Sequence, residues 1–335
     1  MKSTKKLLIF ATLLIVLGAF MAILPACDSN FFTKNYQSAT HEITEQFDSI
    51  SMSTDTADIE FAKSEDQTCK VVCYENKNLQ HTVFVEDNTL KIKVVDTRKW
   101  YQFISFGVND KVTIYLPQSQ YSWLKIKEDT GNVYIPADFS FDNIDLSLST
   151  GDVKCLAQTS NAITIKTSTG NVRCATQVTE SLQITASTGN ITLQNATADN
   201  VKLKVSTGKI SVSNLTCGDL SITVSTGKTY LKNINCTNLT STGNTGDITL
   251  TDVIATQKFS IKRTTGDVEF ARCDADEITI VTDTGDVEGS LLSPKIFTVD
   301  TNTGKKKYPR ENTTGGPCRI TTTTGDVEIK IYQPQ

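Results

Sequence analysis

The sequence is poor in the residues that most enzymes use for catalysis. Its 335 residues include only two histidines, His41 and His81, and no serine or cysteine lies in a recognisable nucleophile motif. Carboxylates are scattered along the chain, whereas a glycosidase or a lyase needs them concentrated in one groove. These absences predict a protein that is not an enzyme and that needs no cofactor.

The chain also lacks an excess of positive charge. Lysine and arginine number 33 against 37 aspartates and glutamates, and the formal net charge is −4. Phosphate-binding surfaces are basic, so nucleic acid is excluded as a partner. With only 7 prolines and many threonines, serines, valines and isoleucines, the composition favours short β-strands over helices or disorder.

One dipeptide, Thr-Gly, recurs through most of the chain. Successive copies lie 19 to 21 residues apart, which is typical of a solenoid in which one unit is stacked repeatedly. Glycine adopts positive φ without steric cost, so we expect the motif to form a structural turn. The glycines are Gly131, Gly151, Gly170, Gly189, Gly208, Gly227, Gly246, Gly266, Gly285, Gly304 and Gly325.

Apolar residues keep a constant phase relative to these glycines. They occupy positions −7, −5, −3, +2 and +4, and in the middle repeats also +7 and +9, so each unit contains about three short segments with alternating side chains. Around Gly208 these residues are Val201, Leu203, Val205, Ile210, Val212, Leu215 and Cys217. The pattern predicts an all-β, parallel β-solenoid with rungs of about 19 residues, and right-handed coiling is favoured.

The region before the array has longer alternating runs. Residues 44–335 are predicted to form the solenoid, with a degenerate first unit around Ala57, a β-meander insertion over 62–120 and regular repeats over 121–335. The insertion would form an antiparallel cap that protects the end of the rod from aggregation, with a hairpin turn at 86–89. An aromatic cluster in it belongs either to the cap core or to an exposed binding patch: Trp100, Tyr101, Phe103 and Phe106.

Two charged features of the array are further candidates. Asp247, Asp267 and Asp286 follow the turn glycine in successive rungs and could hold a divalent ion weakly, although lysine takes this position in other rungs. A basic segment near the C-terminus is either a solvated insertion or a contact for anionic cell-wall polymer or lipid headgroups. Its charged residues are Lys305, Lys306, Lys307 and Arg310.

The cysteines show no metal-binding motif of the Cys-x2-Cys kind. Cys155 and Cys174 share one inward position in adjacent rungs, and Cys217 and Cys236 share another. Each pair is within disulfide reach in principle, but buried free thiols are the commoner use of such positions.

The N-terminus reads as a targeting or anchoring segment over 1–27, followed by a tether over 28–43. Three lysines precede an uncharged apolar stretch from Leu7 to Leu24, and Cys27 ends a sequence similar to a bacterial lipobox. A lipoprotein with a lipidated Cys27 and an uncleaved transmembrane signal anchor both fit. Either predicts a membrane-anchored protein on the extracytoplasmic face.

The chain resembles a bacterial family described as "putative adhesins", a β-strand-repeat domain of unknown function. The resemblance rests on residues 47–59, Trp100-Tyr101, 112–117, 124–133 and 318–329 together with the serial Ser-Thr-Gly-Asp/Asn-Val units. It implies a membrane-tethered extracytoplasmic solenoid, in some cases associated with envelope-stress signalling, and it supplies no catalytic residues.

We therefore expect a non-catalytic surface adhesion, binding or structural module whose partner is a protein or a cell-wall polymer. An accessory sensor in an envelope-stress signalling system is the alternative. A glycan-active β-helix enzyme is a third reading, which would require a cluster of carboxylates in one groove.

Overall fold

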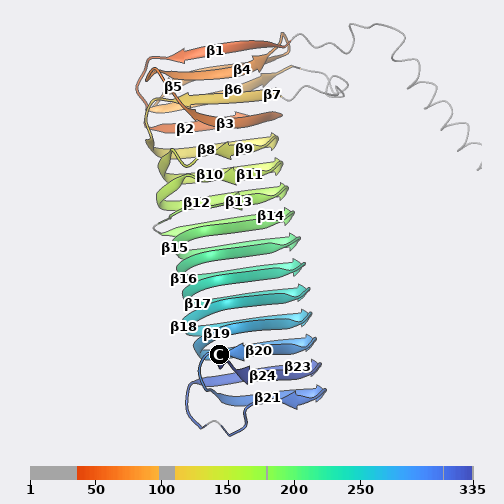
Figure 1. Ribbon diagram of the computed structural model, residues 1–335. Helices are drawn as coiled ribbons and strands as arrows, with labels where there is room; N and C mark the ends of the chain where they lie inside the picture. Colours follow the sequence, from red (N-terminus) through yellow and green to blue (C-terminus); the bar gives the residue numbers. More distant parts are fainter. Residues whose placement is uncertain (1–35, 98–109, 179, 312, 334–335) are drawn as a thin grey trace, which may run out of the picture.

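The computed structural model describes residues 36–97, 110–178, 180–311 and 313–333. Within these ranges all regular structure is β, and no helix is present. The strands lie across the long axis of a rod and are stacked one above another (Figure 1). The predicted all-β solenoid is confirmed.

The strands fall into three groups along the chain. The first group is β1 (Gln37–Ile43), β2 (Ser49–Thr54), β3 (Ala57–Lys63), β4 (Cys69–Glu75), β5 (Leu79–Glu86), β6 (Thr89–Asp96) and β7 (Asp110–Leu116). The array contains β8 (Gln120–Thr130), β9 (Val133–Ile135), β10 (Ser140–Thr150), β11 (Val153–Cys155), β12 (Gln158–Thr169), β13 (Val172–Cys174), β14 (Ser181–Thr188), β15 (Ile191–Thr207), β16 (Ile210–Thr226), β17 (Thr229–Thr245), β18 (Ile248–Thr265) and β19 (Val268–Thr284). The last group is β20 (Val287–Leu291), β21 (Ile296–Thr303), β22 (Lys306–Lys307), β23 (Pro317–Thr324) and β24 (Val327–Ile331).

Neighbouring rungs of the array pair in parallel with equivalent positions opposite each other. In the pairing of β15 with β16, Leu203 lies opposite Ile222 and Thr207 opposite Thr226. Successive strands of a sheet are about 4.8 Å apart, so equivalent side chains form ladders along the rod. The inward ladders of valine, leucine and isoleucine make one continuous hydrophobic core that runs from the cap to the last rungs.

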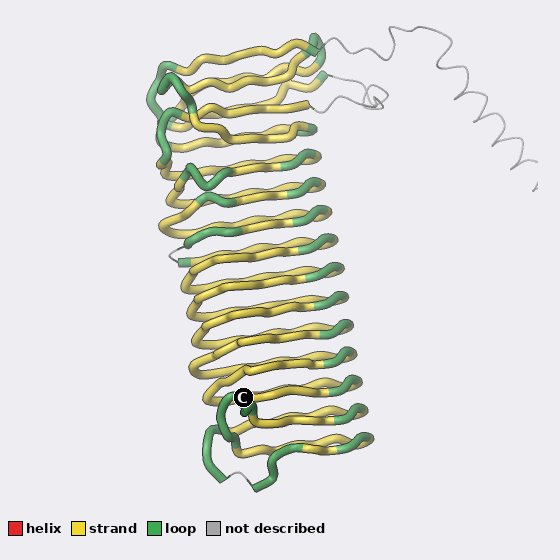
Figure 2. Tube along the Cα trace, in the orientation of Figure 1, coloured by secondary structure: helices red, strands yellow, loops and turns green. Residues whose placement is uncertain are grey.

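The Thr-Gly motif forms the tight turn that the sequence predicts. All eleven glycines have φ between +121° and +159°, and Figure 2 shows the turns lined up along one side of the rod. A Cβ atom added at Gly208 would lie 1.8 Å from the carbonyl oxygen of Gly189 in the rung before. Glycine is required here by both the backbone conformation and the close approach of the next rung.

A second corner lies six residues after each of the middle glycines. Asn195, Asn214 and Asn233 have positive φ there, a conformation that asparagine tolerates better than most residues. Their side-chain amides form a ladder, since Asn214 Nδ2 donates to Asn195 Oδ1 and Asn233 Nδ2 donates to Asn214 Oδ1, each over 2.8 Å. Asp252 and Arg272 continue this corner with a bidentate ion pair.

The N-terminal rungs do not follow the order of the chain. β2 and β3 pair in parallel with β8 and β9 on one side and with β6 and β7 on the other. The degenerate unit around Ala57 is therefore a rung enclosed between the cap and the array. The outer pairings, β1 with β4, β4 with β7 and β5 with β6, are antiparallel, as expected of the cap. Asp87 and Asn88, both with positive φ, form the expected hairpin turn.

The C-terminal rungs are exchanged in a similar way. β23 and β24 pair with β19 and β20 on one side and with β21 and β22 on the other. The rung of Gly325 thus lies between those of Gly285 and Gly304, whereas the regular spacing of the glycines suggests consecutive stacking. The chain first passes to the outer rung, β21 and β22, and then returns to fill the inner place with β23 and β24. Before β21, Lys295 Nζ lies 2.7 Å from Oδ1 of Asp274 on β19 in a largely buried ion pair.

Two ionisable side chains lie inside the hydrophobic core. Glu128 on β8 takes the inward position at which Leu148 stands in the next rung, and its side chain is fully buried. Its carboxyl group accepts hydrogen bonds from the amides of Ala57 (3.1 Å) and Thr130 (3.3 Å) and from the hydroxyl of Thr54. Burial raises the pKa of Glu128 to about 8.

Arg263 on β18 is the second buried ionisable side chain. Its guanidinium donates from Nη2 to the hydroxyl oxygens of Ser241 (3.0 Å) and Thr229 (3.2 Å), and it forms no ion pair with a carboxylate of the described residues. Burial lowers the pKa of Arg263 to about 10. The guanidinium occupies the place that a side chain at Gly243 would need, since a Cβ atom added there would lie 2.4 Å from Arg263 Nη1.

The eight cysteines of the described residues are free, and seven of them are buried. Cys155 lies opposite Cys174 in adjacent rungs, as the repeat spacing predicts. Burial raises the pKa values of Cys273 and Cys318 to about 12, so these thiols are protonated and inert at neutral pH.

Candidate functional site

An open groove of about 710 Å³ crosses the N-terminal rungs next to the glycine turns. It is formed by outward residues of β3, β7, β9, β11, β13 and the start of β15, together with the turn residues that follow the glycines. Because the side chains of a strand alternate, the second residue after the glycine is buried, and the first and third point into the groove. Lys111, Tyr134, Lys154, Arg173 and Lys209 contribute its largest polar side chains.

Two cations of the groove, Lys154 and Arg173, lie in one row along the rod. Tyr134, Lys154 and Arg173 are direct register partners in three adjacent rungs, so the two charges are about 4.8 Å apart at the backbone. Lys154 Nζ lies 4.7 Å from the centre of the Tyr134 ring. Among the residues that the structure describes, Lys154, Arg173 and Lys209 form no ion pair, which leaves these charges available to an anion.

The carboxylates of the groove are already engaged. Glu60 forms an ion pair with Lys111 over 2.6 Å. Asp58 Oδ1 accepts the amide hydrogen of Asn132 over 2.8 Å, and Asp152 Oδ1 accepts that of Asn171 over 2.7 Å. These carboxylates hold neighbouring rungs together, an arrangement that differs from a pair of carboxyl groups facing a glycosidic bond.

The same hydrogen bond explains Asp247, Asp267 and Asp286. Asp247 Oδ1 accepts the amide hydrogen of Asp267 over 3.2 Å, and Asp267 Oδ1 accepts that of Asp286 over 2.9 Å. Lys228 lies 2.9 Å from Asp247 and lowers the pKa of that carboxyl group. The structure therefore gives these residues a role between rungs, and metal binding by them remains a prediction.

The basic segment lies on the outermost C-terminal rung, at the opposite end of the rod from the groove. Lys306 and Lys307 form β22, and Lys307 Nζ lies 2.6 Å from Glu328. The amide of Lys305 donates to Asp326, and Arg310 lies 5.3 Å from the centre of the Tyr308 ring. Two of its charges are thus paired with carboxylates, that of Lys307 with Glu328 of the neighbouring rung and that of Lys306 with Asp300, 3.7 Å away.

The remaining candidates fall outside the described residues. These are Trp100, Tyr101, Phe103 and Phe106 of the aromatic cluster and Cys27 of the proposed lipobox. The described residues contain no helix that is long and apolar enough to cross a membrane.

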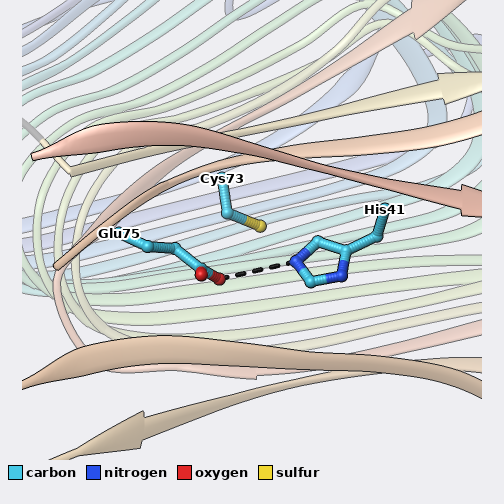
Figure 3. A group of neighbouring side chains, drawn as sticks. All are labelled: His41, Cys73 and Glu75. Atoms are coloured by element: carbon cyan, nitrogen blue, oxygen red, sulfur yellow. Dashed lines mark ion pairs between the residues drawn. The ribbon is translucent and has the colours of Figure 1, made fainter. Parts of the chain in front are cut away.

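A cluster that the sequence did not suggest lies in the cap. Ligand atoms of His41, Cys73 and Glu75 come within 4.8 Å of one another, and the side chains of Cys73 and Glu75 point towards the His41 ring (Figure 3). His81 joins them, with Nδ1 3.2 Å from Glu75 Oε1. Alternation along β4 places Cys73 and Glu75 on one face, but nothing in the sequence shows that both histidines meet them there.

The comparison with protein families decides the relationship. A model described as Toastrack DUF4097 matches residues 47–232 and 209–334. The chain belongs to the Toastrack DUF4097 family. This confirms the family resemblance and the fold, and DUF4097 denotes a domain of unknown function.

The solved structures that this Toastrack chain matches share little sequence identity with it. A putative adhesin from Parabacteroides merdae ATCC 43184 is 14% identical (TM-score 0.35), and a putative lipid binding protein from Parabacteroides distasonis ATCC 8503 is 19% identical (TM-score 0.33). Each alignment covers 89% of this chain and 98% of the other. A putative adhesin from Bacteroides fragilis NCTC 9343 is 14% identical (TM-score 0.28), with 89% and 99% covered. No curated protein matches the sequence.

Proposed function

We propose that this protein is a membrane-tethered, extracytoplasmic β-solenoid that binds an anionic polymer of the cell envelope without catalysis. The observation that carries the proposal is the set of cations in the groove that form no ion pair among the described residues: Lys154 and Arg173, adjacent in one row beside Tyr134, and Lys209 two rungs further on. A polymer with regularly spaced carboxylates or phosphates would contact several rungs at once. The multiple weak contacts would add up to a stable attachment.

The location rests on the N-terminal sequence. Lys2, Lys5 and Lys6 before the apolar stretch support insertion into a membrane with the rest of the chain outside, and Cys27 supports lipidation. The engaged carboxylates of the groove support a binding role over a glycan-active enzyme, because they are held in hydrogen bonds between rungs.

Sedimentation with isolated cell walls tests the binding proposal. The purified full chain is mixed with walls that either keep or have lost their anionic polymers. We expect binding only to the former, and at least a tenfold loss of affinity on reversing two charges in the groove, Lys154→Glu and Arg173→Glu.

The matched control is Lys202→Glu with Lys204→Glu. These lysines are exposed outward residues of β15 that do not line the groove, so the control changes the net charge equally. Equal loss of binding in both double variants would show that net charge, and not the groove, determines binding, which would contradict the proposal. Unchanged binding in the groove variant would also contradict it.

The alternative is an accessory sensor for envelope stress. It is favoured by the position of the groove, which lies in the N-terminal rungs and hence at the end of the rod that the proposed anchor would keep near the membrane. Deleting the protein separates the two. Loss of attachment with an unchanged stress-promoter response supports the binding module, and the reverse result supports the sensor.

A further inference from the structure

The two histidines of the chain converge on one carboxylate oxygen in the cap. His41 lies on β1, Glu75 at the end of β4 and His81 on β5. His41 Nε2 lies 3.5 Å and His81 Nδ1 lies 3.2 Å from Glu75 Oε1. The thiol of Cys73, two residues before Glu75 on the same face of β4, completes the group.

The local fold explains this convergence. β1 and β4 are antiparallel with His41 opposite Val71, so His41 lies on the same face as Cys73 and close to Glu75. A tight turn between β4 and β5, in which Asn76 Oδ1 accepts the amides of Asn78 and Leu79, then folds His81 back towards Glu75. Three strands therefore present their side chains to one point.

Hydrogen bonding within the cap does not account for the whole group. His41 Nε2 is closed off from solvent and makes no hydrogen bond in the described part of the chain. The side chain of His81 is only 2% exposed, and Cys73 is fully buried. An inward ring nitrogen without a partner, beside a thiol and a carboxylate, is an unusual arrangement for a protein interior.

We propose that His41, Cys73 and Glu75 form a binding site for a divalent transition metal ion, with Zn²⁺ as the best match, and that His81 holds Glu75 in place. Zn²⁺ binds histidine, cysteine and carboxylate ligands, and in sites with three protein ligands a water molecule takes the fourth position. With metal–ligand distances of about 2.0 to 2.2 Å, two neighbouring ligand atoms of a tetrahedral site lie about 3.4 Å apart. The distance of 3.5 Å between His41 Nε2 and Glu75 Oε1 falls close to this value.

The ion would link the first strand of the domain to the cap. Among the described strands β1 pairs only with β4, so it is held on one edge, and it directly follows the proposed tether. The His41 side chain is 29% exposed, although its Nε2 faces inward, so this side of the cluster lies nearest to solvent. On binding, the thiol releases its proton to solvent and the thiolate coordinates the metal. Two ligands from β4 and one from β1 would fasten the strand that follows the proposed tether.

Titration of the metal-free full chain with Zn²⁺ in competition with a chromophoric chelator tests the site. We expect one ion per chain with a dissociation constant below about 1 μM. His41→Gln, on the partly exposed β1, and Cys73→Ser should each weaken binding at least about 100-fold, because even the loss of an outer-shell partner costs roughly 10- to 100-fold. Cys69→Ser, on the same face of β4 but outside the cluster, is the matched control and should bind like wild type.

Co²⁺ substitution provides an independent readout of the thiolate. The expected result is a sulfur-to-cobalt charge-transfer band in wild type and in Cys69→Ser, which is lost in Cys73→Ser. Equal Zn²⁺ affinity of wild type and His41→Gln, or a charge-transfer band that persists in Cys73→Ser, would overturn the proposal. If Cys73→Ser does not fold, the comparison of wild type with His41→Gln decides.

Discussion

The buried carboxyl group of Glu128 should make the stability of the solenoid depend on pH. Glu128 is fully enclosed between the first rung and the array, with its oxygens bound to the amides of Ala57 and Thr130. Burial opposes ionisation more than these hydrogen bonds favour it, so the pKa rises to about 8 from its ordinary value of 4.5.

The sign of the effect follows from proton linkage. The unfolded chain releases the Glu128 proton above a pH of about 4.5, whereas the folded chain keeps it up to a pH of about 8. The folded state binds the extra proton within this window, so the free energy of unfolding falls as the pH rises. The slope is about 1.4 kcal/mol per pH unit, which gives a loss of about 3 kcal/mol between pH 5 and pH 7.5.

Glu128→Gln isolates this contribution. The amide keeps an oxygen that accepts from Ala57 and adds a donor for Thr54, and it does not titrate. Urea unfolding of wild type and variant at several pH values should show wild type losing about 3 kcal/mol relative to the variant across the window. Subtracting the two curves removes other titrating groups, His81 among them. A difference that does not change with pH would refute the reasoning, and a difference of opposite sign would mean that Glu128 is ionised in the folded protein.

Three further predictions concern the rungs and their ends. Gly208→Ala should lower the free energy of unfolding by roughly 3 to 5 kcal/mol, because the new Cβ meets the carbonyl of Gly189, whereas Ser211→Ala three residues later should change it by less than about 0.5 kcal/mol; comparable losses in urea unfolding would contradict this. Arg263→Met should raise the free energy of unfolding by roughly 1 to 3 kcal/mol, since a buried charge without a carboxylate partner is replaced by an apolar side chain, and a lower urea midpoint would count against it. Lys295→Met leaves Asp274 without its partner and should cost roughly 3 kcal/mol; hydrogen exchange should then rise in β21 but not in β18, and uniform exchange would argue against a local effect.

The central rungs could be predicted from the sequence because their information is local and repeated. The phase of apolar residues relative to Thr-Gly specified which side chains point inward, and the structure buries Val201, Leu203 and Val205 as the pattern indicates. The second corner has an equally regular signal in the sequence, because Asn195, Asn214 and Asn233 recur at a constant distance from the glycines and asparagine tolerates positive φ.

The ends of the rod and the cap cluster depend on pairings between distant segments. The Gly325 rung lies between the Gly285 and Gly304 rungs. The order of these rungs leaves no mark on the sequence, because both end rungs have the same alternation of inward and outward residues and could pair with either neighbour. The meeting of His41, Cys73 and His81 likewise results from how β1 and β5 fold against β4. A single sequence carries no local signal for such contacts.

The groove falls between these two cases. The repeat phase predicts that Lys154 and Arg173 point outward in adjacent rungs, and the structure confirms this arrangement. The sequence could not show that β7 from the cap contributes Lys111 and so extends the groove beyond the array.

The exchanged rungs at both ends have a consequence for how this rod can change in length. A whole rung added to or removed from the middle of the array keeps every turn, ladder and hydrogen bond in register, because each rung contacts only its neighbours. A rung inserted within the exchanged end regions would instead separate strands that must pair with each other, such as β2 with β6 or β21 with β23. The rod can therefore be lengthened or shortened in steps of about 4.8 Å, and only by changes inside the array.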